Sequence, residues 1–183
     1  SIEKTAFPPL DARVDTTHKP AHLTEARRLW VIPARRNSTR LRDKLLLRET
    51  GRSLLQHTFE AAQQSRSADA VVIAVDDSEV EREALRFGAN VVMTSPDCPS
   101  GTDRVAAVVR ELPAAELIVN LQGDEPEMDP AAIDRLFDSL QENPRASLAT
   151  LATPIRDERL LRDPACVKVV CGSRGQALYF SRA

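Results

Sequence analysis

Positively charged side chains are concentrated in one short stretch, residues 32–44, which reads IPARRNSTRLRDK. Four arginines and one lysine stand there against a single acid, Asp43, although the whole chain has a formal net charge of only −2. A local excess of this kind marks a place for phosphate or carboxylate groups. A solvated basic loop would have the same composition, so composition alone leaves both interpretations open.

Within this stretch, the side chains suited to an anion are Arg35, Arg40 and Lys44, with hydroxyls at Ser38 and Thr39. The stretch has no Walker glycine pattern, so it is not a P-loop. Arginine forks and a lysine can nevertheless hold a triphosphate without a glycine nest. A triphosphate is therefore the ligand that this loop would suit best.

An acid follows a second apolar run, where LIVNL leads into QGDEP at residues 122–126. Gly123 permits a sharp turn, and Asp124 then stands at the end of an expected strand. A lone carboxylate beside bound phosphates suits Mg²⁺, which takes one or two carboxylates together with phosphate oxygens and water. The alternative is a turn acid without a ligand.

A third polar segment, CPSGTDR at residues 98–104, enters an expected helix through small residues. Free N–H groups and a hydroxyl at a helix start suit an anion or the polar edge of a nucleobase. An ordinary helix cap is the alternative, with Thr102 as the expected N-cap.

Apolar runs alternate with amphipathic helical patterns from residue 29 onward, which is typical of an α/β sheet covered on both faces. Pro33 is expected to stop the first strand, and Ser53 with Gln56 has capping-box spacing. The expected strands cover 29–33, 70–75, 90–94, 116–121 and 147–155, the helices 53–64, 77–88, 101–112 and 129–141, and a C-terminal hairpin 167–180.

In such folds, ligands bind beyond the carboxyl ends of the strands. This rule selects the loops 33–44, 94–102 and 122–129, which hold the unusual chemistry described above. The sequence therefore predicts that the cations of the first loop and Asp124 of the third converge on one cleft.

Composition limits the class of protein. The chain has 183 residues, enough for one domain with a real core. It has no apolar run of about 18 residues, so no membrane insertion is expected, and its start does not resemble a signal peptide. Aromatic residues make up 4% of the chain and none lies among the loop arginines, which disfavours nucleic acid as a partner.

Cysteine usage and the N-terminal composition add two expectations. Three cysteines without a CxxC pair favour reduced thiols in a cytoplasmic protein. Residues 1–27, rich in proline and without a clear period, are expected to form an N-terminal extension, either disordered or held against the domain of residues 28–183.

Several motifs together resemble one enzyme family. IPAR, STRL, SGTDR, VNLQGDEP, SLATLATPI, VKVV and ALYFSRA occur in this order from about Leu29 to Ala183. They resemble the 3-deoxy-manno-octulosonate (Kdo) cytidylyltransferases, or CMP-Kdo synthetases. The resemblance implies a three-layer, Rossmann-like nucleotide-diphospho-sugar transferase fold with a mostly parallel sheet and a C-terminal hairpin. It also implies CMP transfer from CTP to Kdo for lipopolysaccharide synthesis, with Mg²⁺ and usually as a homodimer.

The resemblance also implies roles for individual residues. Carried over by position, the triphosphate would be held by Arg35, Ser38, Thr39, Arg40 and Lys44. The cytosine would be bordered by Ser100, Gly101, Thr102 and Arg104. Gln122 would face nucleotide and sugar, Arg182 would approach the sugar acid, and Asp124 would bind magnesium. Arg35, Lys44 and Asp124 would form the catalytic set.

Members of this family continue well beyond their Phe-Ser-Arg-Ala stretch, and that part carries a second metal carboxylate, most sugar contacts and much of the dimer surface. A fragment is therefore expected, with CTP–Mg²⁺ binding but without useful turnover. Two alternatives stay open: a truncated or degenerate CTP-binding module, and a cytidylyltransferase for another acidic sugar such as sialic acid.

Overall fold

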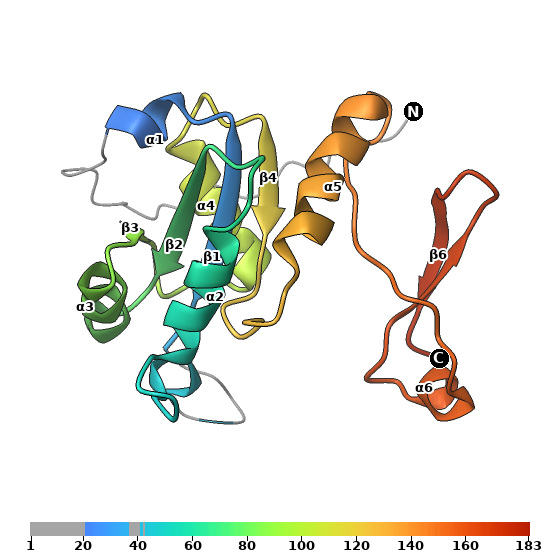
Figure 1. Cartoon of the computed structure of the whole chain (residues 1–183), viewed down its shortest axis with the longest axis horizontal. Coiled ribbons are helices and arrows are strands. Elements are labelled where there is room, and N and C mark those ends of the chain that lie inside the picture. Colours follow the sequence, from blue (N-terminus) through green and yellow to red (C-terminus); the bar gives the residue numbers. More distant parts are fainter. Residues whose placement is uncertain (1–20, 37–40, 42) are drawn as a thin grey trace. The chain divides into compact units, whose positions relative to one another are not determined.

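Two compact units make up the computed structural model, which describes residues 21–36, 41 and 43–183 (Figure 1). The first unit extends to Pro144 and the second runs from Arg145 to Ala183, and each is described by itself. Within the described ranges, no helix is both long and apolar enough to cross a membrane.

A parallel sheet lies at the centre of the first unit, with the strand order β3-β2-β1-β4. Its apolar, β-branched runs form strands because they are buried on both faces. In register, Trp30 of β1 lies opposite Val71 of β2 and Val119 of β4. The strands are β1 (Arg28–Ala34), β2 (Ala70–Val75), β3 (Asn90–Met93) and β4 (Leu117–Asn120).

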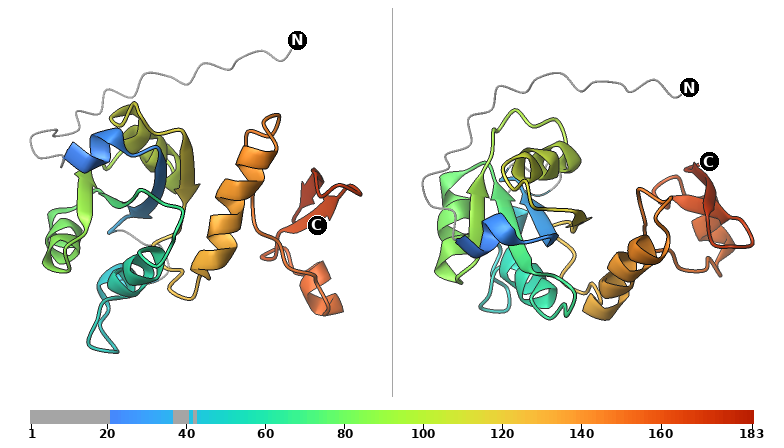
Figure 2. Two further views of the ribbon diagram at one scale, coloured as in Figure 1. Left: turned by 45° about the horizontal axis from the view of Figure 1, so that its top comes forward. Right: turned by 90° about the horizontal axis from the view of Figure 1, so that it is seen from above.

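Helices cover both faces of this sheet (Figure 2), as the alternating pattern predicts. Trp30 and Ile32 of β1 pack in one cluster with residues of α2, α3 and α5. Leu29 and Val31 point the other way and pack with α1 and α4. The helices of this unit are α1 (Ala21–Glu25), the short 3₁₀ helix η1 (Lys44–Leu46), α2 (Leu54–Ala62), α3 (Ser78–Arg86), α4 (Gly101–Arg110) and α5 (Pro130–Glu142).

Helix ends agree with the sequence prediction at most positions. The side chain of Ser53 accepts a hydrogen bond from the Gln56 N–H at the start of α2, and Asp129 caps α5. Thr102 is not the N-cap of α4, so that prediction is wrong. The cap is Ser100, whose extended backbone precedes the helix and whose Oγ accepts from the Asp103 N–H.

Pro33 does not stop the first strand, contrary to the prediction. β1 continues through Pro33, which pairs with Ala74, and ends at Ala34. The reason is the short neighbour β4, which ends opposite Val31. The carbonyl of Val31 points toward the β4 side, where it accepts from the N–H of Leu121. Pro33 faces the same side two residues later, beyond the end of β4, where a missing N–H leaves no ladder bond unmade.

The second unit contains α6 (Glu158–Arg162) and an antiparallel hairpin of β5 (Lys168–Cys171) and β6 (Ala177–Ser181). The predicted hairpin is therefore confirmed. The predicted strand at 147–155 is wrong, because this segment has no paired neighbour among residues 145–183. Its apolar pattern is exposed instead, with Leu148 at 75%.

The α/β fold class with a parallel sheet and a C-terminal hairpin is confirmed. The boundary expected after residue 27 stays a prediction. Leu23 and Ala26 are buried with β1 and α4, so the packed part of the chain begins before that boundary.

Candidate active site

The strand order marks the place between β1 and β4, at the carboxyl edge of the sheet, as the candidate site. From β1 the chain moves outward to β2 and β3, and then returns to form β4 on the other side of β1. The order of the strands therefore reverses beside β1, and the carboxyl ends of the strands at such a reversal are where parallel sheets bind ligands. The basic loop follows β1, and the segment containing Asp124 follows β4.

Lys44 and Asp124 meet in this region although they lie 80 residues apart in sequence. The Lys44 Nζ is 2.6 Å from the Asp124 Oδ2. Their side chains are 39% and 42% exposed, so both can still be reached by a ligand. The structure thus places a cation of the first loop directly against the acid of the third loop.

Close backbone packing brings the three loops together. A Cβ on Gly123 would lie 3.3 Å from the carbonyl oxygen of Pro33 and against the side chain of Leu45. A Cβ on Gly101 would lie 3.3 Å from the Pro33 ring and 3.6 Å from the Gln122 Oε1. Glycine at both positions therefore allows the segments after β1 and β4 and the start of α4 to approach one point.

Two neighbouring arginines at the end of β1 differ in their environment. Arg35 is exposed and has no partner in the part of the chain that the structure describes. Arg36 is bound by three acids, Asp43 at 3.2 Å, Asp77 at 3.1 Å and Glu79 at 2.5 Å. Its hydrogen bond to Asp77 raises the pKa of Arg36. Arg36 is therefore a structural residue, whereas Arg35 is free to meet an anion.

The other three predicted residues of the basic loop, Ser38, Thr39 and Arg40, lie outside the described residues. Their roles stay predictions.

A row of polar side chains runs from the start of α4 to the segment after β4. The Asn120 Nδ2 donates to the Thr102 Oγ1 at 3.4 Å, and the Gln122 Nε2 donates to the Asn120 Oδ1 at 3.2 Å. All three residues are exposed. Amide and hydroxyl groups in a row can read the polar edge of a base. Asn120 was missed by sequence reasoning, although a polar residue ending the apolar run LIVN was the available signal.

Ser100 and Arg104 bind other side chains of the protein. The Ser100 hydroxyl accepts from the Asp103 N–H and donates to the Asp103 Oδ2 at 2.5 Å. Arg104 is fully buried, with its Nη2 donating to the Asp76 Oδ2 at 2.8 Å and its Nη1 to the Thr94 hydroxyl. A direct contact of Arg104 with a nucleotide stays a prediction, and the structure gives it an internal partner instead.

The turn that carries Asp124 is anchored from α2. The hydroxyl of Thr58, a buried side chain, donates to the Gly123 carbonyl at 2.9 Å. Burial, and the charge of Asp124, raise the pKa of the adjacent Glu125. The hydrogen bond from Thr58 therefore fixes the turn on which Asp124 stands.

Asp124 is also the residue that fits a magnesium ion. Within the described ranges, no three His, Cys, Asp or Glu side chains gather in a way that could hold a metal. Asp124 offers a hard oxygen ligand at an exposed position, and the ammonium of Lys44 already places a cation there. One carboxylate with phosphate oxygens and water is a donor set that magnesium accepts. The residues present therefore fit this ion when a phosphate ligand completes the set.

Arg182 belongs to the second unit. Its Nη1 donates to the carbonyl oxygens of Pro164, at 3.1 Å, and of Ala165, at 3.4 Å. A contact with a sugar acid stays a prediction.

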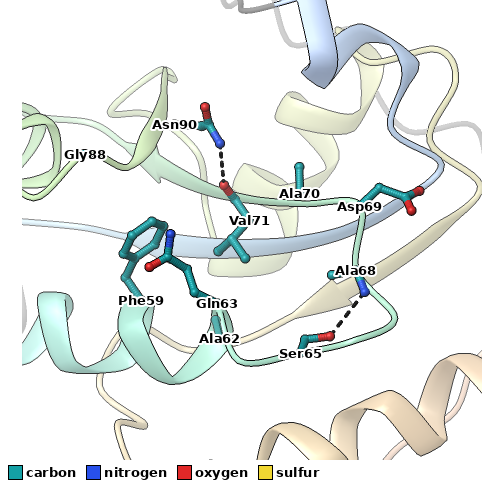
Figure 3. A pocket seen from close by; sticks show the side chains of 10 residues that line it. All are labelled: Phe59, Ala62, Gln63, Ser65, Ala68, Asp69, Ala70, Val71, Gly88 and Asn90. Carbon is teal, nitrogen blue, oxygen red and sulfur yellow. Dashed lines mark hydrogen bonds between the residues drawn. The ribbon is translucent and has the colours of Figure 1, made fainter.

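A hollow at the opposite, amino edge of the sheet offers a contrast (Figure 3). It lies between the end of α2 and the starts of β2 and β3, and Asp69 is its only charged lining residue. That carboxylate is bound to the N–H groups of Arg27 and Arg28 and to the Arg28 side chain. The hollow therefore lacks the free charges of the carboxyl edge.

Known proteins resemble this chain over most of its length. The 3-deoxy-manno-octulosonate cytidylyltransferases of Rhodopirellula baltica and Cellvibrio japonicus are each 48% identical over 84% of the chain, which covers 61% and 60% of those proteins. The solved structure of CMP:2-keto-3-deoxy-manno-octonic acid synthetase complexed with CTP is 39% identical, with a TM-score of 0.82 over 86% of this chain and 64% of that one.

The chain thus spans about 60% of the length of the curated relatives it matches. The resemblance seen in its motifs is confirmed by these proteins. The model of one family, described as cytidylyltransferase, matches residues 29–183. The chain belongs to the cytidylyltransferase family.

Proposed function

We propose that this chain carries the CTP-binding part of a 3-deoxy-manno-octulosonate cytidylyltransferase, which transfers CMP from CTP to Kdo and releases pyrophosphate. The observation that carries the proposal is the contact between Lys44 and Asp124 at the carboxyl edge of the sheet, the edge at which Arg35 follows β1. Support comes from the similar solved structure, which is a complex with CTP.

In this proposal, a hydroxyl oxygen of Kdo forms a bond to the α-phosphorus of CTP while the bond from that phosphorus to the pyrophosphate breaks. Repulsion between the triphosphate and the incoming oxygen must be reduced first, so positioning and electrostatics supply most of the catalysis. Arg35 and Lys44 would neutralise the phosphates, together with the predicted residues Ser38, Thr39 and Arg40. A bound magnesium would add positive charge at the phosphates.

The base of the nucleotide would lie along the polar row at the start of α4. Gly101 leaves room beside Pro33, while Thr102, Asn120 and Gln122 offer hydrogen-bonding groups. Ser100 and Arg104 would lie behind these groups and hold α4 in place. Gln122 would also face the sugar. Arg182 is proposed to approach the carboxylate of the sugar.

Further parts of the proposal rest on the resemblance alone. These are a homodimer, a product used for lipopolysaccharide and a cytoplasmic location. Light scattering on the purified chain would check the oligomeric state.

The single carboxylate favours a second, narrower function, which is CTP binding without useful turnover. Asp124 is the acid that the resemblance assigns to the metal, and among the described residues no group of three His, Cys, Asp or Glu side chains could hold one. Another acidic sugar such as sialic acid is supported less, since the relatives described above are named for Kdo.

Two measurements test these proposals. Calorimetric titration with CTP and with UTP, each with magnesium, should show tighter binding of CTP. Pyrophosphate release from CTP and Kdo then separates an enzyme from a binding module. Lack of CTP binding would contradict both functions.

Asp124→Asn provides the matched test of the metal. The variant should keep its fold, because the pair with Lys44 is exposed, but should lose the magnesium-dependent part of CTP binding. Equal stimulation by magnesium in the variant and the wild-type chain would remove Asp124 from the proposed site.

A further inference from the structure

Asp76, at the end of β2, contacts two other segments at the carboxyl edge of the sheet. Its Oδ1 accepts from the backbone N–H of Arg36 at 3.1 Å, and its Oδ2 accepts from the Arg104 Nη2 at 2.8 Å. One carboxylate thus connects the end of β1 with α4. The reaction proposed above does not use Asp76.

The partner on the helix side is held rigidly. Arg104 is 0% exposed, and Asp76 is only 12% exposed. The Arg104 Nη1 also donates to the Thr94 hydroxyl and to the Ser95 carbonyl, both just after β3. Because a buried charge is costly unless it is paired and hydrogen-bonded, this cluster strongly favours a single arrangement of the strand ends.

Asp76 transmits that arrangement to the start of the basic loop. The backbone of Arg36 is fixed by Asp76, and its side chain is fixed by Asp77 from the same turn. Burial alone would raise the pKa of Asp77, but hydrogen bonds from the N–H groups of Glu79 and Val80 and from Arg36 outweigh it and lower that pKa.

Arg35 is the direct neighbour of this fixed point. Its side chain is exposed and forms no hydrogen bond or ion pair with the part of the chain described by the structure. Its direction therefore depends on the backbone that Asp76 holds one residue later. A phosphate ligand needs such preorganisation, since a misplaced cation binds less well.

We infer that Asp76 is a positioning residue for CTP, which sets the backbone at Arg36 and thereby aims Arg35 at the phosphates. The inference rests on the proposed CTP binding. It also assigns a structural role to the buried Arg104, because the side chain of Arg104 holds Asp76 in place.

Paired variants isolate the contact with the loop. Asp76→Ala alone would leave Arg104 buried without its partner, so both test variants also carry Arg104→Met. In that background, Asp76→Asn keeps an oxygen for the Arg36 N–H, whereas Asp76→Ala removes it. We expect the Asn form to bind CTP about tenfold more tightly than the Ala form, which is the value of one hydrogen bond.

Cytidine, which has no phosphates, distinguishes positioning from general damage. Its dissociation constant, measured by NMR titration, should be within about twofold in the two forms, because a purely structural loss would weaken both ligands alike. Asp76→Glu serves as a variant that keeps the charge beside Arg104 while displacing the carboxylate. It should also weaken CTP selectively.

Asp69→Ala is the matched control at the other end of β2. Asp69 also accepts from backbone N–H groups, those of Arg27 and Arg28, and pairs with an arginine, but it lies at the amino edge. It should lower stability without changing the ratio of CTP to cytidine affinity. An unchanged ratio in the Asp76 variants, with CTP bound by the wild-type chain, would overturn the positioning role alone. No CTP binding by the wild-type chain would overturn the proposed function and this inference with it.

Discussion

The two edges of the parallel sheet use the same chemistry for different purposes. At the amino edge, Asp69 receives two backbone N–H groups of the segment that enters β1. At the carboxyl edge, Asp76 receives one N–H group of the segment that leaves β1. Both acids hold the central strand, yet only the second lies at the edge that carries Arg35, Lys44 and Asp124.

The difference follows from the course of the chain. The loops that enter β2, β3 and β4 are short, and the one before β2 is held by Asp134, which accepts hydrogen bonds from the N–H groups of Arg66 and Ser67. The loops that leave β1 and β4 are longer and pass over the strand ends. The exposed Arg35 and the Lys44–Asp124 pair lie on these longer loops, at the edge where parallel sheets bind ligands.

The largest effect that would sharpen this comparison is expected for Arg35→Ala. Loss of a charge-assisted contact with phosphate should weaken CTP binding by about 1.5–3 kcal/mol. The free energy of unfolding should hardly change, because this exposed side chain has no partner among the described residues. Calorimetric titration and chemical denaturation measure the two quantities.

Arg66→Ala is the control for that variant. Arg66 is also exposed, but it lies after α2 at the amino edge. Its loss should leave the dissociation constant of CTP unchanged. Equal effects of the two substitutions would mean that CTP responds to the total charge of the chain and not to one edge.

The sequence predicted the sheet and its functional edge because both depend on local patterns. Apolar runs such as 70–75 and the N-caps Ser53 and Asp129 are readable without tertiary information. The strand-end rule then placed Lys44 and Asp124 in one region, and their contact in the structure agrees with this expectation.

Local patterns could not predict which side chains bind residues that lie far away in the sequence. Arg36 and Arg35 are identical neighbours in sequence, and only the three acids around Arg36 distinguish them. Arg104 was expected to border the cytosine, but it is buried and bound to Asp76, a residue 28 positions away. The segment 147–155 has a strand-like pattern without a neighbour to pair with in its unit.

Glu83→Gln would test how the loop containing Lys44 is held at the carboxyl edge. Burial would raise the pKa of Glu83, but hydrogen bonds from Arg86, Ser53 and Arg48 lower it from 4.5 to about 2. A lowered pKa in the folded state stabilises the protein above pH 4.5, and this contribution is lost as the pH falls toward 2.

At neutral pH, the free energy of unfolding of the Gln variant should therefore be about 2 kcal/mol lower than that of the wild-type chain. This value includes a reduction for solvent screening, because Arg48 and Arg86 are both half exposed. Denaturation between neutral pH and pH 3 should show the difference between the two proteins becoming smaller. A difference that is constant with pH would exclude the ionised carboxylate as its cause.

A smaller effect, about 1 kcal/mol or more of stability, is expected for Gly123→Ala. The new Cβ would meet the backbone oxygen of Pro33 at 3.3 Å, so the turn carrying Asp124 must shift away from β1. CTP binding should weaken as well. Gly172→Ala is the control, because the atoms nearest to its Cβ would lie at ordinary distances of 3.6 Å and more. Similar losses from both substitutions would remove the argument for close packing at the site.

The smallest effect is expected at the amino edge, for Arg27→Ala. Its guanidinium is 2.6 Å from Glu116, but the two side chains are 67% and 58% exposed. Water and salt screen such a pair, and its two long side chains lose rotamer freedom when they meet, so the gain is small. The midpoint of urea denaturation and the dissociation constant of CTP should both equal those of the wild-type chain. If Arg27→Ala weakened CTP binding as Arg35→Ala does, the amino edge would share in recognising the nucleotide, and the division of labour between the two edges would be wrong.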